Sequence, residues 1–200
     1  ELMEVKESIP LKLVDRRAIN TLILSAWDNI AEPDKEHRIL KSELRGPADT
    51  ASNTSKLDST LSRLQACQLK LTIQRDGKTY KKSISLLRSF AMPQDGSGDI
   101  IYQFEPEMVQ MFQSSTHWGK LERDVMLHFR SKYSLALYEL LMKRINLKWK
   151  WQEQFEVEEL RSLLGVPEGK LKAYKTFKQK VLQPAFQEVN GLSNVDCQYH

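Results

Sequence analysis

The sequence predicts an α+β protein with two tandem winged helix-turn-helix domains, the second truncated at its wing. Residues 131–190 show the order of a long helix, a short strand, a short helix and a second long helix. The same order is expected roughly 117 residues earlier, which indicates an internal repeat. An alternating stretch with an Asp-Gly turn follows the first copy, as a wing would. We therefore divide the chain into residues 1–128 and 129–200.

The first copy begins with a helix that Asp15 is expected to cap. Apolar residues recur from Ile19 to Ile30 at the spacing of a helix that packs on one face. Three further elements are expected after it: a strand at 38–40, a short helix at 41–45, and a helix carrying Leu57, Leu61 and Leu64. The repeat then continues into the wing.

A change of hydrophobic period marks this wing. Leu69, Leu71 and Ile73 alternate with polar residues, Asp76-Gly77 favours a tight turn, and residues 79–87 can return as the second strand. Beyond it we expect a strand at 100–104 and a helix that begins at Pro106. Residues 114–130 fit either a strand or a helix.

The second copy starts with an apolar helix near Lys132, followed by a connection and short strand at 149–155. A short helix at 158–164 is expected to end at Gly165, which can adopt the left-handed backbone conformation. The last helix begins near Ala173, and Pro184 is expected to kink its end.

This last helix is the main candidate DNA reader. Five lysines and no acid lie between Gly169 and Gln183, which favours an anionic partner over an ordinary solvated face. On a helical wheel the apolar side is Tyr174, Phe177, Val181, Ala185 and Val189. The candidate DNA-binding residues are Lys172, Lys175, Thr176, Gln179, Lys180 and Gln183, with Lys178 at the edge as a phosphate contact.

The first copy offers a smaller set of candidate DNA contacts. These are Lys56, Ser59, Thr60 and Arg63 on its third helix and Lys78 beside the hairpin turn. A scaffold or dimerising domain with weak DNA contacts is an equally good interpretation of this helix.

The residues favour no enzymatic activity, no cofactor and no metal. Four scattered histidines form no ligand set, and Tyr133, Tyr138 and Tyr174 are expected in the core. Two distant cysteines indicate a reducing, intracellular compartment, and no apolar run is long enough to span a bilayer.

Three motifs in order, SKYSLALYELL, FEVEELRSLLGV and YKTFKQKVLQPAFQEVN, resemble the iteron-binding replication initiators of plasmids. LVDRRAINTLILSAW and IIYQFEPEM extend the similarity into the first half. The resemblance implies that the second domain reads one end of a repeated origin site and the first domain the other. It also implies that Ser131 and Lys132 touch phosphate, and that residues 175–180 enter the major groove.

The resemblance further implies a homodimeric repressor form that associates through the first domain, besides monomers on origin repeats. The implied partners are double-stranded DNA, the host initiator that opens the origin, and the replicative helicase, all in the bacterial cytoplasm. A winged-helix transcriptional regulator on a palindromic operator remains an alternative, because fold does not determine function. A DNA-nicking enzyme is a third, which the scattered histidines argue against.

Overall fold

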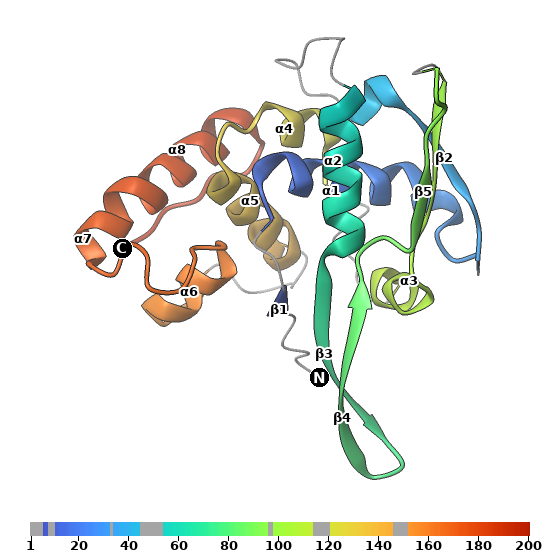
Figure 1. Ribbon diagram of the computed structural model, residues 1–200. Helices are drawn as coiled ribbons and strands as arrows, with labels where there is room; N and C mark the ends of the chain where they lie inside the picture. Colours follow the sequence, from blue (N-terminus) through green and yellow to red (C-terminus); the bar gives the residue numbers. More distant parts are fainter. Residues whose placement is uncertain are drawn as a thin grey trace. The chain divides into compact units, whose positions relative to one another are not determined.

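The structure is a computed structural model that describes residues 6–7, 11–32, 34–44, 54–95, 98–113, 121–145 and 152–200. The chain forms two compact units, Glu1–Ser115 and Thr116–His200, and each unit is described by itself (Figure 1). A loop is also expected from the small polar residues at 48–54; its residues 48–53, and Trp149 and Trp151, lie outside the described residues, and Thr54 begins a helix.

The first unit contains helices and strands in the predicted alternation. In chain order these are β1 (Lys6–Glu7), α1 (Leu13–Ala26), the 3-10 turn η1 (Trp27–Asn29), β2 (His37–Leu40), the 3-10 turn η2 (Lys41–Leu44), α2 (Thr54–Ala66), β3 (Gln68–Arg75), β4 (Lys78–Ser85), β5 (Ser89–Ala91), β6 (Asp99–Gln103) and α3 (Pro106–Gln113). The predicted strand at 38–40, the hairpin after the third helix and the helix that begins at Pro106 are all confirmed.

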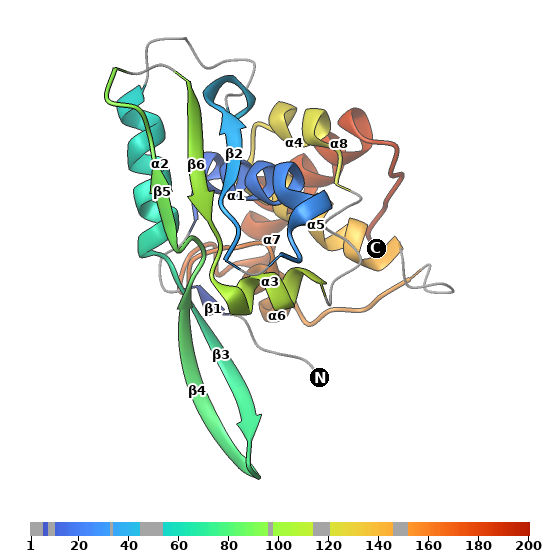
Figure 2. The same ribbon diagram turned by 90° about the vertical axis from the view of Figure 1, so that its right-hand side faces the viewer.

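This unit has two antiparallel three-stranded sheets, with strand orders β1-β3-β4 and β2-β6-β5. In Figure 2 the β3–β4 hairpin projects below the helices. The β3–β4 hairpin, which we call the wing, pairs Gln68 with Ser85 and Arg75 with Lys78. Asp76 and Gly77 both have positive φ, 52° and 71°, as a two-residue hairpin turn requires. The Asp-Gly signal therefore identified the turn correctly.

The core of the first unit joins α1, α2 and the β2-β6-β5 sheet. Leu22, Ile23, Leu61 and Leu64 are fully buried between the two helices. Tyr102 on β6 is 1% exposed, and its hydroxyl donates a hydrogen bond of 2.8 Å to the Leu22 carbonyl. This bond fixes the sheet to α1, so that α2 is held on a rigid support.

Asp15 does not cap α1 in the way the sequence predicts. Lys12 is the N-cap and Asp15 is the third helical residue, with its carboxylate accepting a 2.9 Å hydrogen bond from the Lys12 backbone N–H. An acid at this position can reach back to the cap residue, which satisfies a donor that the helix leaves open. Asp15 is 1% exposed, so it also needs a cationic partner.

The described part of the second unit is helical. Its elements are α4 (Arg123–His128), α5 (Lys132–Ile145), α6 (Val157–Leu163), α7 (Tyr174–Phe177), the π turn η4 (Lys178–Leu182) and α8 (Gln183–Leu192). Residues 123–128 are thus a helix, which decides the open question about 114–130 for that segment. Residues 152–156 form no strand, so the predicted strand near Phe155 is wrong for them. None of the helices that the structure describes is long and apolar enough to cross a membrane.

We expect acid to destabilise the first unit through His37. Its ring is 7% exposed and lies 5.5 Å from the Tyr102 ring and 5.9 Å from the Phe104 ring, centroid to centroid. Burial lowers the pKa of His37, so the folded state binds a proton less readily than the unfolded chain does. Stability should therefore be complete above the ordinary histidine pKa and fall as the pH drops below it.

Urea titrations between about pH 8 and about pH 5 measure this loss. The variant His37→Phe removes the titrating group and should flatten the dependence in this range. An equally steep loss in that variant would contradict the assignment to His37.

Candidate nucleic-acid interface

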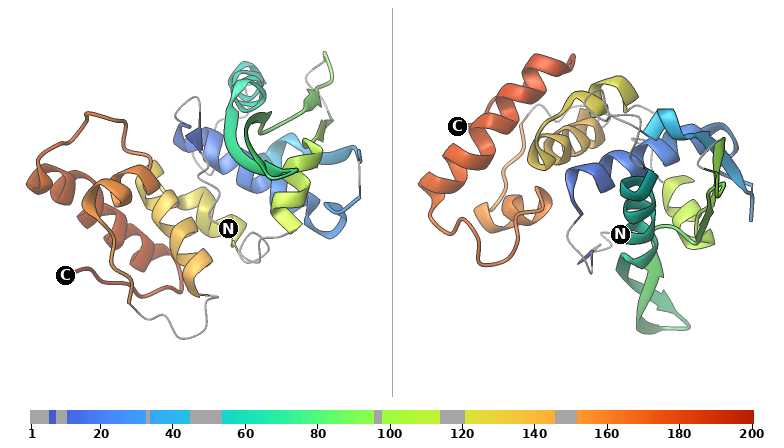
Figure 3. Two further views of the ribbon diagram at one scale, coloured as in Figure 1. Left: turned by 90° about the horizontal axis from the view of Figure 1, so that it is seen from below. Right: turned by 45° about the horizontal axis from the view of Figure 1, so that its top comes forward.

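Elements α7, η4 and α8 form one long helix, drawn in red in Figure 3. Its buried side consists of Phe177, Val181, Leu182, Ala185 and Val189, each 3% exposed or less, and packs against α5 through η4 and α8. The opposite side is exposed and carries Lys175, Gln179, Lys180 and Gln183 of the predicted DNA-binding set, with Thr176 and Lys178 half-buried. Lys172 is exposed in the turn before the helix, which begins at Tyr174. The helix thus has the apolar back and polar front that a DNA reader needs.

Tyr174 corrects the predicted apolar side. It is 47% exposed, although helical spacing places it one turn before Phe177. Tyr174 is the first residue of α7, whereas the packing against α5 is made by η4 and α8 further along the helix. The helix therefore presents an aromatic ring beside its lysines. Tyr138 is fully buried as predicted, and Tyr133 is intermediate.

Pro184 alters the hydrogen bonding of the turn that precedes it, and the helix continues beyond the proline. The Gln183 backbone N–H donates to the Lys178 carbonyl five residues back, which makes η4 a π turn, and α8 continues to Leu192. Proline has no N–H to donate to the carbonyl four residues back, and its ring crowds that carbonyl. A wider turn relieves both problems. It also brings Val181 and Leu182 to the buried side together, which the helical wheel missed.

Arg161 holds the turn before this helix, and sequence reasoning did not select it. Its guanidinium donates hydrogen bonds to the Leu171 carbonyl and, at 2.9 Å, to the Lys172 carbonyl. It also lies 4.4 Å from the Phe177 ring centroid, and its side chain is 6% exposed. The contacts fix the chain where Leu171 has a φ of 53°, a conformation that non-glycine residues rarely adopt.

A signal for Arg161 was present in the sequence. The buried residues Arg161 and Leu164 are three residues apart, so they share one face of α6. An arginine on an apolar face needs an internal partner. Gly165, by contrast, was placed correctly, because it has a φ of 71° and follows the last turn of α6.

Ser131 and Lys132 carry internal hydrogen bonds. The Ser131 hydroxyl accepts a 3.1 Å bond from the Tyr133 backbone N–H at the start of α5. The Lys132 ammonium donates a 2.9 Å bond to the Gly165 carbonyl and lies 5.0 Å from the Tyr133 ring centroid. Lys132 thus fixes the end of α6 to α5. A phosphate contact by either residue would have to share these groups.

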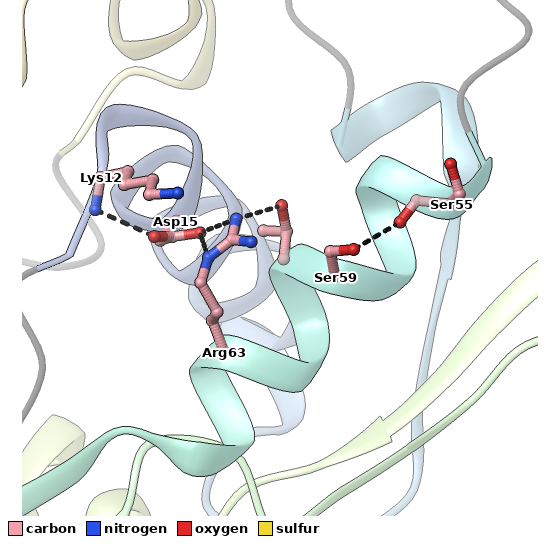
Figure 4. Close-up of polar contacts among 6 residues, drawn as sticks. Lys12, Asp15, Ser55, Ser59 and Arg63 are labelled. Carbon is pink, nitrogen blue, oxygen red and sulfur yellow. Dashed lines mark hydrogen bonds and ion pairs between the residues drawn. The ribbon is translucent and has the colours of Figure 1, made fainter.

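In the first unit, α2 presents few polar groups that are not already engaged. Figure 4 shows Arg63 directed at Asp15, with Arg63 Nη2 2.6 Å and Nε 3.0 Å from Asp15 Oδ1. The Ser59 hydroxyl donates to the Ser55 carbonyl at 2.8 Å, and Thr60 is buried. Lys56 remains exposed on α2, and Lys78 is exposed beside the turn of the wing.

Within the described residues, no three His, Cys, Asp or Glu side chains are grouped so that they could hold a metal ion. Among the described residues, no acid forms an ion pair with Lys175, Lys178 or Lys180 of the long helix. The Lys178 ammonium lies 5.3 Å from the Tyr199 ring centroid. The exposed side of the long helix therefore carries lysines without neighbouring acid partners among the described residues, a charge pattern that suits an anion.

Comparison with protein families assigns both halves of the chain. Residues 1–142 match the family model described as Initiator Replication protein, WH1, and residues 156–200 match Initiator Rep protein, WH2. The chain belongs to the initiator replication protein family. The initiator therefore has two winged-helix domains, as predicted, and acts through DNA binding in replication initiation.

Two of the solved structures that match this initiator support its fold, and a third match is weaker. Two crystal structures of RctB domains 2 and 3 match it with TM-scores of 0.59 and 0.55 at 12% identity, each over 92% of this chain and 72% of the other. The WH1 domain of MSBI1.176, a replication protein isolated from a multiple sclerosis patient, matches 57% of this chain and 86% of its own at 15% identity, with a TM-score of 0.44. A comparison with curated protein sequences finds no match.

Proposed function

We propose that this initiator binds tandem direct repeats at a bacterial plasmid origin and reads each repeat with the long helix α7–η4–α8. The observation that carries the proposal is the exposed row of Lys175, Gln179 and Gln183 over a fully buried apolar side, with the exposed Lys172 in the turn before it. Lysine can donate to guanine and glutamine can pair with adenine in the major groove. Lys178 and Lys180 then contact phosphate, and Thr176 either phosphate or a base edge.

The remaining roles in the proposal are those that the resemblance to iteron-binding initiators implies. The first unit adds contacts through Lys56 and Lys78 and associates with a second copy in a repressor form. Monomers on the repeats recruit the host initiator that opens the origin and the replicative helicase. The chain has no enzymatic activity of its own in this proposal and works in the cytoplasm.

Selection from a random duplex library at about 0.15 M salt tests the proposal. An asymmetric motif of about two helical turns supports a monomer that reads one repeat with two domains. A short palindrome would instead support the transcriptional regulator. If no motif is enriched and binding disappears as the salt concentration rises, the lysines make only an electrostatic contact with DNA that does not depend on sequence.

We expect Lys175→Ala or Gln179→Ala to lower affinity for the selected motif by about 1–3 kcal/mol, because each side chain would lose its contact with a base edge. Binding titrations on the motif and on a random duplex measure the difference. Lys143→Ala, an exposed lysine on α5, is the matched control and should change neither affinity. An equal loss on both duplexes would assign Lys175 and Gln179 to phosphate.

A further inference from the structure

The chain after α8 folds back along the long helix. The Ser193 backbone N–H and hydroxyl both donate to the Val189 carbonyl, at 3.0 and 2.8 Å. The same hydroxyl accepts a 3.2 Å bond from the Val195 N–H, and Val195 is 9% exposed. These bonds hold the start of residues 193–200, which we call the return segment. Figure 1 shows this segment in red, from the end of α8 to the chain end.

Asn190 on α8 binds the return segment through both ends of its side-chain amide. Its Nδ2 donates a 2.9 Å bond to the Cys197 carbonyl, and its Oδ1 accepts a 3.1 Å bond from the Cys197 backbone N–H. The Cys197 thiol donates to the same Oδ1 at 3.0 Å. An amide that bonds both backbone groups of one residue acts as a residue of a paired antiparallel strand does. Asn190 therefore fixes both the position and the orientation of Cys197.

Tyr199 lies two residues further along and contacts the side of the long helix. Its ring centroid is 4.9 Å from that of Phe186 on α8, with 60° between the ring planes. The Lys178 ammonium on η4 lies 5.3 Å from the Tyr199 centroid. An ammonium within about 6 Å of a ring centroid is attracted by the negative face of the ring. The ring thus connects the return segment to a lysine of the helix.

This contact restrains Lys178 before any partner binds. A lysine ammonium is carried on a flexible four-carbon side chain, and fixing that side chain costs conformational entropy. A side chain that is already held loses less freedom when it binds, which raises affinity. The ring occupies one side of the ammonium, so N–H donors remain for phosphate oxygens. Lys178 is therefore both restrained and able to bind an anion.

We infer that Asn190 and Tyr199 are positioning residues for DNA binding. Asn190 holds the return segment, and the Tyr199 ring holds the Lys178 ammonium in place for a phosphate. Neither Asn190 nor Tyr199 needs to contact the DNA itself. The inference rests on the proposed function, in which Lys178 contacts phosphate, and adds how that contact is prepared.

Packing alone is the competing explanation of this arrangement. Under it, Tyr199 and Val195 only cover the side of α8, and the ammonium of Lys178 lies near the ring without consequence. Removing the ring would then affect the stability of the second unit and leave the contribution of Lys178 to DNA binding unchanged. A double-variant cycle between Tyr199 and Lys178 separates the two explanations, because it measures the coupling of the two side chains.

The first measurement needs no DNA. In proton NMR spectra of the full chain, the ε-methylene signal of Lys178 should lie upfield of those of other lysines, because of the ring current of Tyr199. Tyr199→Leu and Asn190→Ala should both return this signal to the ordinary position, and Tyr199→Phe should keep it upfield. An ordinary position in the wild type, or an upfield signal in Asn190→Ala, overturns the inference.

The second measurement is affinity against salt concentration, on the selected motif and on a random duplex. Lys178→Gln should make the slope of log K against log salt shallower by about 0.9, the contribution of one phosphate contact. Tyr199→Leu and Asn190→Ala should each weaken binding about threefold, by the strength of an exposed cation–π contact. The loss should be equal on both duplexes, because a phosphate contact carries no sequence information. Neither variant should weaken binding further when Lys178 is already glutamine.

The matched control is Phe155→Leu. The Phe155 ring lies 5.9 Å from the Arg144 guanidinium carbon, a contact of the same kind outside the long helix and the return segment, so affinity should not change. Tyr199→Phe should bind as the wild type does, and a loss there would overturn the inference in favour of a direct contact by the hydroxyl. An equal loss from Tyr199→Leu with and without Lys178 overturns it in favour of packing. Failure of the wild type to select a motif counts against the proposed function instead, because the random duplex alone decides the inference.

Discussion

Replacing Arg63 by methionine should destabilise the first unit by about 3 kcal/mol, the loss expected when a buried ion pair loses one partner. Asp15 is 1% exposed and would keep the Lys12 N–H but lose both bonds from Arg63. Thr60 would lose the bond that it accepts from Arg63 Nη2. Urea unfolding followed by circular dichroism measures the change in the free energy of unfolding.

Two further variants separate the ion pair from a general effect of losing an arginine. Arg88→Met removes an arginine of the same unit whose pair with Asp34 is exposed, and it should change stability by no more than about 1 kcal/mol. Asp15→Asn combined with Arg63→Met removes the buried charge and keeps an acceptor for Lys12, so most of the lost stability should return. A double variant as unstable as Arg63→Met alone would contradict the account.

Replacing Arg161 by methionine should lower affinity for the selected DNA motif roughly hundredfold, or about 3 kcal/mol. The substitution removes the hydrogen bonds to the Leu171 and Lys172 carbonyls and the contact with Phe177, which together fix the start of the long helix. A displaced helix loses several base contacts at once, each worth about 1–3 kcal/mol. Titration on the motif and on a random duplex measures the effect.

Arg161→Lys should not restore affinity, because a lysine cannot bond two carbonyls and stack on a ring at the same time. Arg144→Met is the control within the same unit. It removes a half-buried arginine that pairs with Glu153 at 2.7 Å, outside the turn before the long helix. Wild-type affinity in a folded Arg161→Met chain would show that the turn needs no such support.

The fold could be predicted because its information is local and periodic. Helical spacing in 19–30, alternation in 69–73 and the Asp76-Gly77 turn each depend on neighbouring residues only. The short helices of the two copies were expected to begin near residues 41 and 158. η2 begins at Lys41 and α6 at Val157, so the predicted offset between the copies agrees with the structure at this element. The predicted strand near Phe155 was wrong because an aromatic residue shortly after two tryptophans fits an irregular, half-exposed segment as well as it fits a strand.

The candidate site was only partly predictable, because several of its side chains are decided by tertiary contacts. The exposed lysines and glutamines of the long helix follow from the wheel alone. The roles of Arg63, Lys132 and Arg161 do not, since their partners are 48, 33 and 10 or 11 residues away in the chain. Tyr174 shows the same limit. Helical spacing predicts which side of the helix carries this ring, but it does not predict which part of that side packs against α5.

The π turn has a consequence for how this helix tolerates insertion and deletion. Phe177, Val181, Ala185 and Val189 follow a spacing of four, whereas an α-helix repeats every 3.6 residues, so the row would otherwise wind around the helix. The wider turn absorbs this drift and keeps the buried row, and with it the opposite row of Lys175, Gln179 and Gln183, parallel to the axis. Losing one residue between 178 and 182 would turn everything after it by about 100° and bring core residues to the surface. Pro184 thus determines how Lys175, Gln179 and Gln183 line up along the helix, although it need not contact the partner itself.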